Sequence, residues 1–355
     1  MKQFWIFVKK EFRHILRDLW STIIVLVLPI LMIVLFGFGI SSEMKSTAFG
    51  VLNIQENSRG LQIVENMDQS DFFELKSSYP TEQSLENAFK AGEIRFAIVF
   101  GKEQIRLIAD ATDPNSASTM VAYASGIIGQ YFQNQNPNIT PKIKSEIKLL
   151  YNPSLKGTYN TVPGIIGMVL LLISAMMSSV SIAKEKEMGS MELLLISKLK
   201  PMTLILSKLL PYFVLSNVNL LSTLLLGHYL LEVPINGSLI SILLFSELYL
   251  LLSLSIGLLI SSVTDSQLVA LLLSGMGMIL PVVMLSGLLF PIDNMPLILQ
   301  WLSNIVPAKW YIDGLRKLMI MGLGWSDVIK ELMILCLLFT VCLTLSLKRF
   351  KTRLE

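Results

Sequence analysis

Six long apolar runs constrain this chain more than any other feature of its sequence. A helix needs about 20 apolar residues to cross the roughly 30 Å hydrocarbon core of a bilayer, and each run is long enough. The composition agrees, because 53% of the 355 residues are hydrophobic and only 15% are charged. We therefore predict an α-helical polytopic membrane protein with six transmembrane helices. Their predicted ranges are 20–40, 162–183, 204–231, 239–261, 268–290 and 328–347.

Lysine and arginine residues lie beside alternate loops and predict the orientation of the chain. Such residues concentrate in the cytoplasmic segments of membrane proteins. Here they cluster in residues 1–19, in residues 184–200 and in the tail, 348–355. With six spans, these three segments fall on one side of the membrane. We therefore expect a multi-pass protein of the plasma (inner) membrane with both termini in the cytoplasm.

Residues 41–158 are too polar for hydrocarbon and are predicted to form an inserted extracytoplasmic α/β domain. The stretch from Glu43 to Glu146 contains half of the 26 acidic residues. Alternating residues and turn signals predict the element order βαβαββαβ. The predicted strands are 48–54, 72–79, 94–100, 104–110 and 143–151, and the predicted helices are 58–68, 81–92 and 114–133.

Residues 1–19 are predicted to form a cytoplasmic amphipathic helix in the membrane interface. Their apolar residues recur at helical spacing, with lysine and arginine on the other face. Such a helix binds anionic lipids, so we expect membrane lipids among the partners of this chain.

Motifs for catalysis are missing from the sequence. The one Gly-Lys pair, Gly101-Lys102, is followed by Glu103 and does not form a phosphate-binding loop. The two histidines, His14 and His228, offer neither a zinc pair nor a Ser-His-Asp set. We therefore expect a chain that is not an enzyme, with no catalytic residue, no metal site, no cofactor of its own and no nucleic-acid partner.

Residues 184–200 are the most informative local segment. Charges come first and methionine and leucine follow, which predicts a short helix with an acidic stripe beside an apolar one. A helix of this kind, parallel to the membrane, can dock in a groove of a soluble partner. The alternative is a turn that is solvated at the inner surface. The residues concerned are Glu185, Lys186, Glu187, Met188, Gly189, Ser190 and Glu192.

This segment resembles the cytoplasmic signature of ABC-2 type exporter permeases, which reads Arg or Lys, Glu, two residues, Gly, Thr or Ser, and Glu. The resemblance continues through residues 286–296, through 301–311, and at 151–153 before the second span. With the six apolar runs and the large first outer loop, it covers nearly the whole chain. One departure is the basic stretch 198–201, where the family often has Thr-Pro.

The resemblance implies a permease that works with a second permease, identical or paralogous, and with a separate ABC ATP-binding subunit. That subunit would hold the ATP and magnesium. In the family, the helix that carries Glu185, Glu187, Gly189 and Glu192 is a coupling helix in a cleft of the ATPase. The resemblance also places the first and fifth spans at the seam between two permeases. A periplasmic adaptor is left open as a further partner.

The outer segment, residues 291–320, has its own pattern. Prolines at 291, 296 and 307 forbid one continuous helix, while 297–306 is apolar enough to dip into the membrane. The family resemblance implies a re-entrant gate. The alternative is an interfacial hairpin anchored in the head groups by Trp301, Trp310 and Tyr311.

Polar residues inside the predicted spans are unfavourable unless they have a function or a partner, because inserting a charged side chain at the centre of the membrane costs about 2.5–3.5 kcal/mol. Glu247 is predicted to line a substrate path or to pair with Lys309 or Arg316. The alternatives are an interhelical contact or a carboxyl kept protonated by burial. The candidate residues of the path or gate are Asn217, Asn219, Glu247, Pro291, Asp293, Asn294 and Pro296.

The pattern as a whole favours the permease subunit of an ATP-driven exporter. Amphiphilic or hydrophobic cargo, such as a drug-like compound, a lipid or a polymer precursor, suits a path rich in methionine and phenylalanine. The alternative is a non-transporting membrane scaffold or sensor whose domain 41–158 binds a ligand or an adaptor. A secondary transporter is less favoured, because the sequence shows no inverted repeat.

Overall fold

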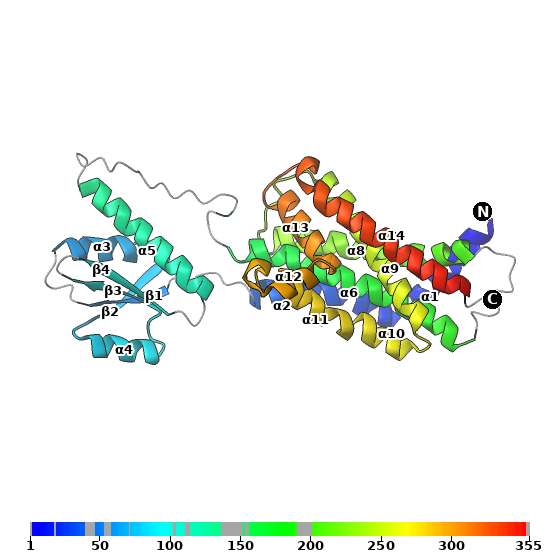
Figure 1. Ribbon diagram of the computed structural model, residues 1–355, viewed down its shortest axis with the longest axis horizontal. Coiled ribbons are helices and arrows are strands. Elements are labelled where there is room, and N and C mark those ends of the chain that lie inside the picture. The colour runs from blue at the N-terminus through cyan, green and yellow to red at the C-terminus, as the bar shows by residue number, and fades with distance from the viewer. Residues whose placement is uncertain are drawn as a thin grey trace. The chain divides into compact units, whose positions relative to one another are not determined.

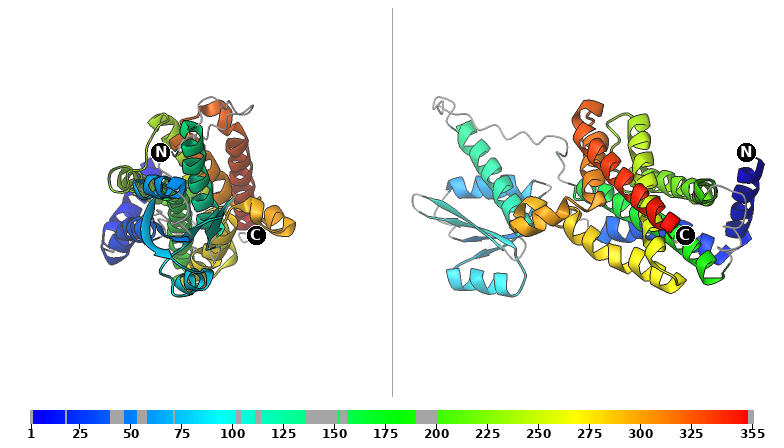
Figure 2. Two further views of the ribbon diagram at one scale, coloured as in Figure 1. Left: turned by 90° about the vertical axis from the view of Figure 1, so that its left-hand side faces the viewer. Right: turned by 45° about the vertical axis from the view of Figure 1, so that its right-hand side comes forward.

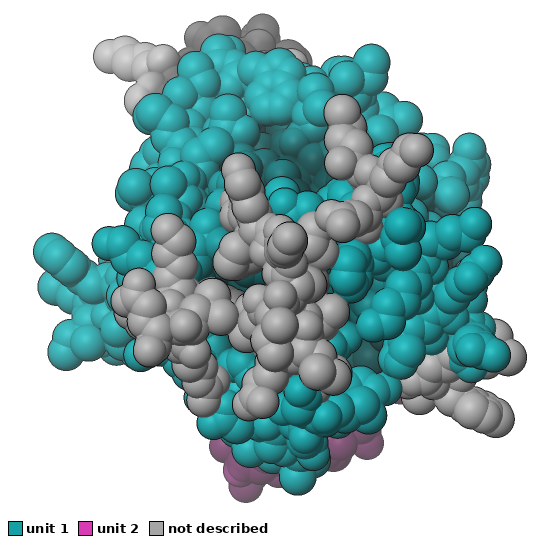
Figure 3. All heavy atoms as spheres, turned by 90° about the vertical axis from the view of Figure 1, so that its right-hand side faces the viewer, with its two compact units in different colours: residues 1–42, 156–355 teal, residues 43–155 magenta. Residues whose placement is uncertain are grey.

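The chain divides into two compact units, Met1–Ser42 with Lys156–Glu355 and Glu43–Leu155 (Figure 3). The computed structural model describes residues 2–17, 19–39, 47–52, 58–70, 72–101, 104–110, 114–135, 152, 156–189 and 201–352.

The first unit is built of helices (Figure 1). In order they are α1 (Lys2–Arg17), α2 (Leu19–Gly39), α6 (Thr158–Glu187), α8 (Pro201–Tyr229), α9 (Leu239–Val263), α10 (Gln267–Ser274), α11 (Met276–Leu285), η2 (Ile292–Asn294), α12 (Leu297–Ser303), α13 (Pro307–Met319), η3 (Trp325–Val328) and α14 (Ile329–Thr352).

Helix α6 is the centre of this unit. It packs against α2, α8, α9, α10 and α13 (Figure 2). Most of its residues from Thr158 to Ala183 are buried. A helix that is apolar on every side is suited to such a position. Serines on α6 add interhelical hydrogen bonds: Ser174 to Ser216 of α8, Ser178 to the carbonyl of Leu254 in α9, and Ser179 to Ser274 of α10.

Five segments in the described part of the chain are long and apolar enough to cross a membrane. They are Thr158–Glu187, Ile205–Tyr229, Leu239–Val263, Gln267–Leu285 and Trp325–Arg349, and α2 contributes a shorter apolar stretch, Val25–Gly37. These helices are those of a polytopic membrane protein. The count of six spans stays a prediction.

Two helix boundaries differ from the prediction. The run 268–290 is not one helix, because the chain breaks at the pair Ser274-Gly275 between α10 and α11, a combination at which helices often kink. Helix α6 also continues to Glu187, so the first charged residues of the predicted coupling helix 184–200 extend the second predicted span instead. Residues 190–200 lie outside the described part.

The outer segment is interrupted where its prolines stand. Pro291 precedes η2, Pro296 precedes α12, and Pro307 begins α13. Within α13, Trp310 is buried, and the ring of Tyr311 stacks on that of Tyr249 with the centroids 3.9 Å apart.

Burial in the protein core contradicts a head-group anchor at Trp310 or Tyr311. Trp301, which is 77% exposed, is the one of the three predicted anchors that remains accessible.

The second unit contains a four-stranded sheet with helices on both faces (Figure 1). Strand β1 pairs in parallel with β2 and β3, and β4 pairs antiparallel with β3, which gives the order β2-β1-β3-β4. Helix α4 covers one face, and α3 and α5 cover the other. The elements are β1 (Thr47–Leu52), α3 (Ser58–Asp68), β2 (Phe73–Tyr79), α4 (Glu82–Lys90), β3 (Phe96–Phe100), β4 (Ile105–Ala109) and α5 (Pro114–Gln135). The predicted strand 143–151 lies outside the described residues.

Close packing of α6 on α9 depends on Gly257. A Cβ atom at this position would meet the backbone oxygen of Ala175 and would lie 2.8 Å from the Cβ of Ser178. We expect Gly257→Ala to destabilise the helical unit by about 1–3 kcal/mol through overpacking. Thermal unfolding of the purified chain measures the effect. Gly277→Ala is the control, because a Cβ there has no neighbour closer than 3.7 Å; equal shifts for both variants would contradict the packing argument.

Candidate functional site

Three consecutive charged residues close α6: Glu185, Lys186 and Glu187. We call them the α6 hub, because each of them binds a different part of the helical unit. All three are among the residues predicted to couple this chain to an ATPase.

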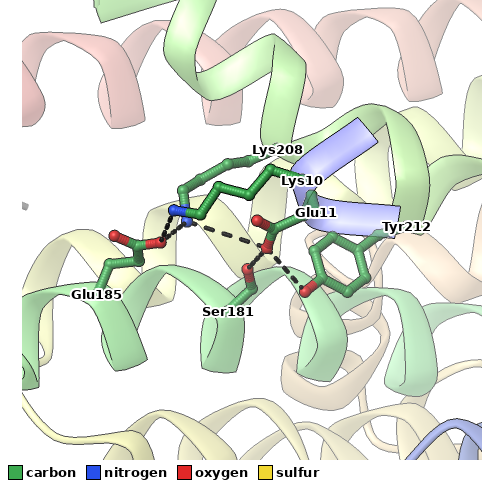
Figure 4. Close-up of polar contacts among 6 residues, drawn as sticks. All are labelled: Lys10, Glu11, Ser181, Glu185, Lys208 and Tyr212. Atoms are coloured by element: carbon green, nitrogen blue, oxygen red, sulfur yellow. Dashed lines mark hydrogen bonds and ion pairs between the residues drawn. The ribbon is translucent and has the colours of Figure 1, made fainter. Parts of the chain in front are cut away.

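Glu185 joins α6 to α8 and α1 (Figure 4). Its carboxylate accepts a hydrogen bond of 2.7 Å from Nζ of Lys208 in α8, and Nζ of Lys10 in α1 lies 4.0 Å from the same oxygen. The Lys208 side chain is only 6% exposed. A buried lysine of this kind requires a paired carboxylate, since an isolated buried charge is costly.

Glu11 of α1 is the second carboxylate beside Lys208. Its Oε1 lies 4.0 Å from Nζ of Lys208 and accepts hydrogen bonds from Ser181 at 3.1 Å and from Tyr212 at 3.2 Å (Figure 4). Helix α1 therefore docks on α8 and α6 through a buried charge as well as through apolar residues. Sequence reasoning missed Glu11, although it lies three residues after Val8 and four before Ile15, on the face that these buried residues share.

Lys186 and Glu187 bind the two helix ends on either side of the α9–α10 turn. Lys186 Nζ donates to the carbonyl oxygens of Ser261 and Thr264, the latter at 3.1 Å. The carboxylate of Glu187 accepts from the backbone N–H of Gln267 at 2.8 Å and from its side-chain amide at 3.1 Å. A cation at the end of α9 and an anion at the start of α10 match the free backbone groups and the dipoles of those helices.

A glycine, Gly189, follows the end of α6 and has a φ of +67°. Its N–H donates to the carbonyl of Lys186 at 3.0 Å, which satisfies one of the last carbonyls of the helix. This conformation explains why a glycine follows the charged residues. Met188 is 66% exposed beside it. Ser190 and Glu192, the remaining predicted coupling residues, lie outside the described part.

The predicted path residues separate into two groups. Asn217 of α8 donates to the carboxylate of Glu247 in α9 at 3.2 Å, which is the geometry of an interhelical contact. No described ion pair joins Glu247 to Lys309 or Arg316, so the structure does not contain the predicted pairs. Asn219 is buried, and neither polar atom of its amide has a hydrogen-bond partner among the described residues.

The gate residues form the second group, on the loop between α11 and α12. Pro291, Asn294 and Pro296 are exposed, and Asp293 belongs to η2. Within the described ranges, no hydrogen bond connects this loop to Asn217 or Glu247. A role of either group in a substrate path stays a prediction.

We expect the charge network around Lys208 to stabilise the folded chain. Lys208→Met leaves Glu11 and Glu185 without their shared cation, and breaking a buried pair costs about 3–5 kcal/mol. We expect that loss in the unfolding of the purified chain, and a smaller one in the double variant Lys208→Met with Glu185→Gln, which also removes one carboxylate charge.

Lys9→Met removes an exposed lysine from α1 and serves as the control for this network. A Lys208→Met variant as stable as this control would show that the network contributes nothing to the fold.

Known proteins resemble this chain over most of its length. The family described as ABC-2 family transporter protein matches residues 20–348. The probable multidrug ABC transporter permease YbhS of Escherichia coli (strain K12) is 31% identical over 329 residues, or 88% of this chain and 87% of that protein. The probable multidrug ABC transporter permease YbhR of the same organism is 25% identical, covering 88% and 89%. The inner membrane transport permease YhhJ, also from that organism, is 26% identical, covering 96% and 95%.

These matches confirm the predicted family and the prediction that the chain is not an enzyme. In this family the permease is the transmembrane subunit, and ATP hydrolysis belongs to a partner ATP-binding subunit. The match includes the α6 hub, which lies within residues 20–348. The chain belongs to the ABC-2 family of ABC transporters and is one of its membrane permeases.

Proposed function

We propose that this chain is the permease subunit of an ATP-driven exporter, assembled with a second permease and with separate ATP-binding subunits that hold ATP and magnesium. The observation that carries the proposal is the α6 hub. Its three side chains contact α1, α8, the end of α9 and the start of α10. A force applied at the end of α6 would therefore reach four other helices.

Met188 and Gly189 are the described residues best suited to receive that force. The hub side chains are occupied within their own chain, whereas Met188 projects from the end of α6 and is exposed. A flexible apolar side chain of this kind adapts well to a groove of a partner. We infer that Met188, Gly189 and the residues that follow contact the ATP-binding subunit, while the hub passes the movement inward.

The orientation and the cargo belong to the same proposal. The hub lies on the cytoplasmic side, both termini lie in the cytoplasm, six helices span the inner membrane, and the unit Glu43–Leu155 lies outside, where an adaptor can bind it. YbhS and YbhR are named probable multidrug transporter permeases, which supports an amphiphilic or hydrophobic cargo for this chain.

Glu187 tests the coupling. Glu187→Lys places a cation at the N-terminus of α10, where a misplaced charge costs about 1–2 kcal/mol. We expect ATP-dependent uptake of a hydrophobic dye into inverted vesicles to fall by about five- to thirtyfold, with assembly of the complex unchanged.

Glu86→Lys in the second unit is the matched control, because Glu86 is exposed and, among the described residues, its ion pair is with Lys90 on the same helix. A wild-type complex that hydrolyses no ATP and moves no dye would instead favour a non-transporting scaffold.

Gly189 tests the geometry at the end of α6. The left-handed conformation costs a β-branched residue most and asparagine least, so Gly189→Val should reduce dye uptake while Gly189→Asn preserves most of it. The same vesicle assay measures both variants. Equal loss in the two would mean that the side chain at this position, and not the backbone, decides coupling.

A further inference from the structure

A cavity of about 330 Å³ lies in the helical unit between α1, α2, α6, α8 and α10. Its volume is at the lower end of the range of about 300–1,000 Å³ that small-molecule sites occupy. None of the residues predicted as path or gate lines it. The cavity is adjacent to the charge network of Figure 4, since Ser181 and Tyr212 belong to both.

The lining on α6 changes from apolar to polar along the helix. Ile173 and Met177 line one end of the cavity, and Ser181 and Lys184 line the other. From Ile173 to Lys184 the helix rises by about 16 Å. The cavity is therefore long enough to hold a molecule with two chemically different ends.

Helices α8 and α10 repeat this order. Helix α8 contacts the end of α6 in its N-terminal part, through Lys208 and Glu185, and α10 does so at its first residue, through Gln267 and Glu187. On α8, Tyr212 is nearer to that end than Leu215, and on α10 Gln267 comes one turn before Leu271. Three helices thus place their polar lining residues beside the hub and their apolar ones farther away.

The polar end of the cavity is basic. Lys184 and His14 line it, and neither the ammonium group of Lys184 nor the imidazole of His14 forms a hydrogen bond or an ion pair with another residue of the described part. The carboxylates nearby are already engaged: Glu11 and Glu185 with Lys208, and Glu187 with Gln267. A cation that faces a cavity without a carboxylate of its own favours an anionic ligand.

We propose that this cavity binds a single-chain amphiphile with an anionic head group. The head group lies beside Lys184 and His14, and the chain lies between Ile173, Met177 and Leu215. Met177 and its neighbour Met176 also line the cavity and can adapt to chains of different shape. That this ligand is cargo rests on the exporter function proposed above, whereas its binding does not.

Binding to the full-length chain in lipid discs of zwitterionic phospholipid tests the site. The probes are a dansyl-labelled undecanoate and its uncharged methyl ester, which share one tail. We expect Lys184→Gln to raise the Kd of the acid about tenfold, as for a lost hydrogen bond to a charged group, and to leave the Kd of the ester unchanged. Lys9→Gln is the control for charge outside the cavity, and Met177→Trp, which fills the apolar end, should weaken both probes.

Two results would overturn the site: a Kd of the acid that Lys184→Gln does not change, or tight binding of both probes that survives Met177→Trp. Repeating the titration in discs with an anionic phospholipid identifies the source of the ligand. Competition supports a membrane lipid as the natural occupant, and an unchanged Kd supports a soluble amphiphile.

Transport separates this inference from the proposed function. If the chain binds the acid but the complex transports no amphiphile with ATP, the proposed binding site is supported and the exporter function is contradicted. If the complex transports the hydrophobic dye but the chain does not bind the acid, the exporter function is supported and the proposed binding site is contradicted.

Discussion

The ion pair between Lys208 and Glu185 determines how the end of the helical unit is assembled. It is buried, so neither charge can be separated from the other without a large desolvation cost. The pair fixes the rotation of α6 about its axis. Consecutive residues on an α-helix point about 100° apart, so Lys186 and Glu187 must face other directions than Glu185. They meet the end of α9 and the start of α10, which places three neighbouring charges on three sides of one helix.

The same rotation produces the polar end of the cavity. Ser181 lies one turn before Glu185 and binds Glu11, while Lys184 lines the cavity space between the helices. Tyr212 and Gln267 line that space and are also bonded to Glu11 and to Glu187. A shift of the hub cannot occur without moving these lining residues. In the proposed exporter, this shared set of contacts connects the end of α6 with the ligand site.

Local pattern was enough to predict the long helices but not the contacts between them. Each of α6, α8, α9 and α14 contains a long stretch of high hydropathy. The end of α6 was not predicted, because the sequence placed Gly189 inside a separate helix, 184–200. Glu11 and Lys208, by contrast, are far apart in sequence, and no local signal joins them. Trp310 and Tyr311 have the composition of interface anchors, and only the stacking of Tyr311 on Tyr249 shows that they belong to the core. The break at Gly275 also needed the structure, since an apolar run tolerates glycine without a kink.

Helix α8 has polar side chains on two different faces. They belong both to the predicted path residues and to the charge network that the sequence did not predict. Lys208 and Asn219 are eleven residues apart, about three full turns, so they share a face with Ser216, which binds Ser174 of α6. Asn217 lies on the other face and binds Glu247 of α9. Single hydrogen bonds inside a membrane contribute only about 0.6 kcal/mol on average. An interface between helices that is made of such hydrogen bonds shifts more easily than one made of interlocked large side chains. The proposed exporter requires this ease of movement of α8, between the hub and the outer loops.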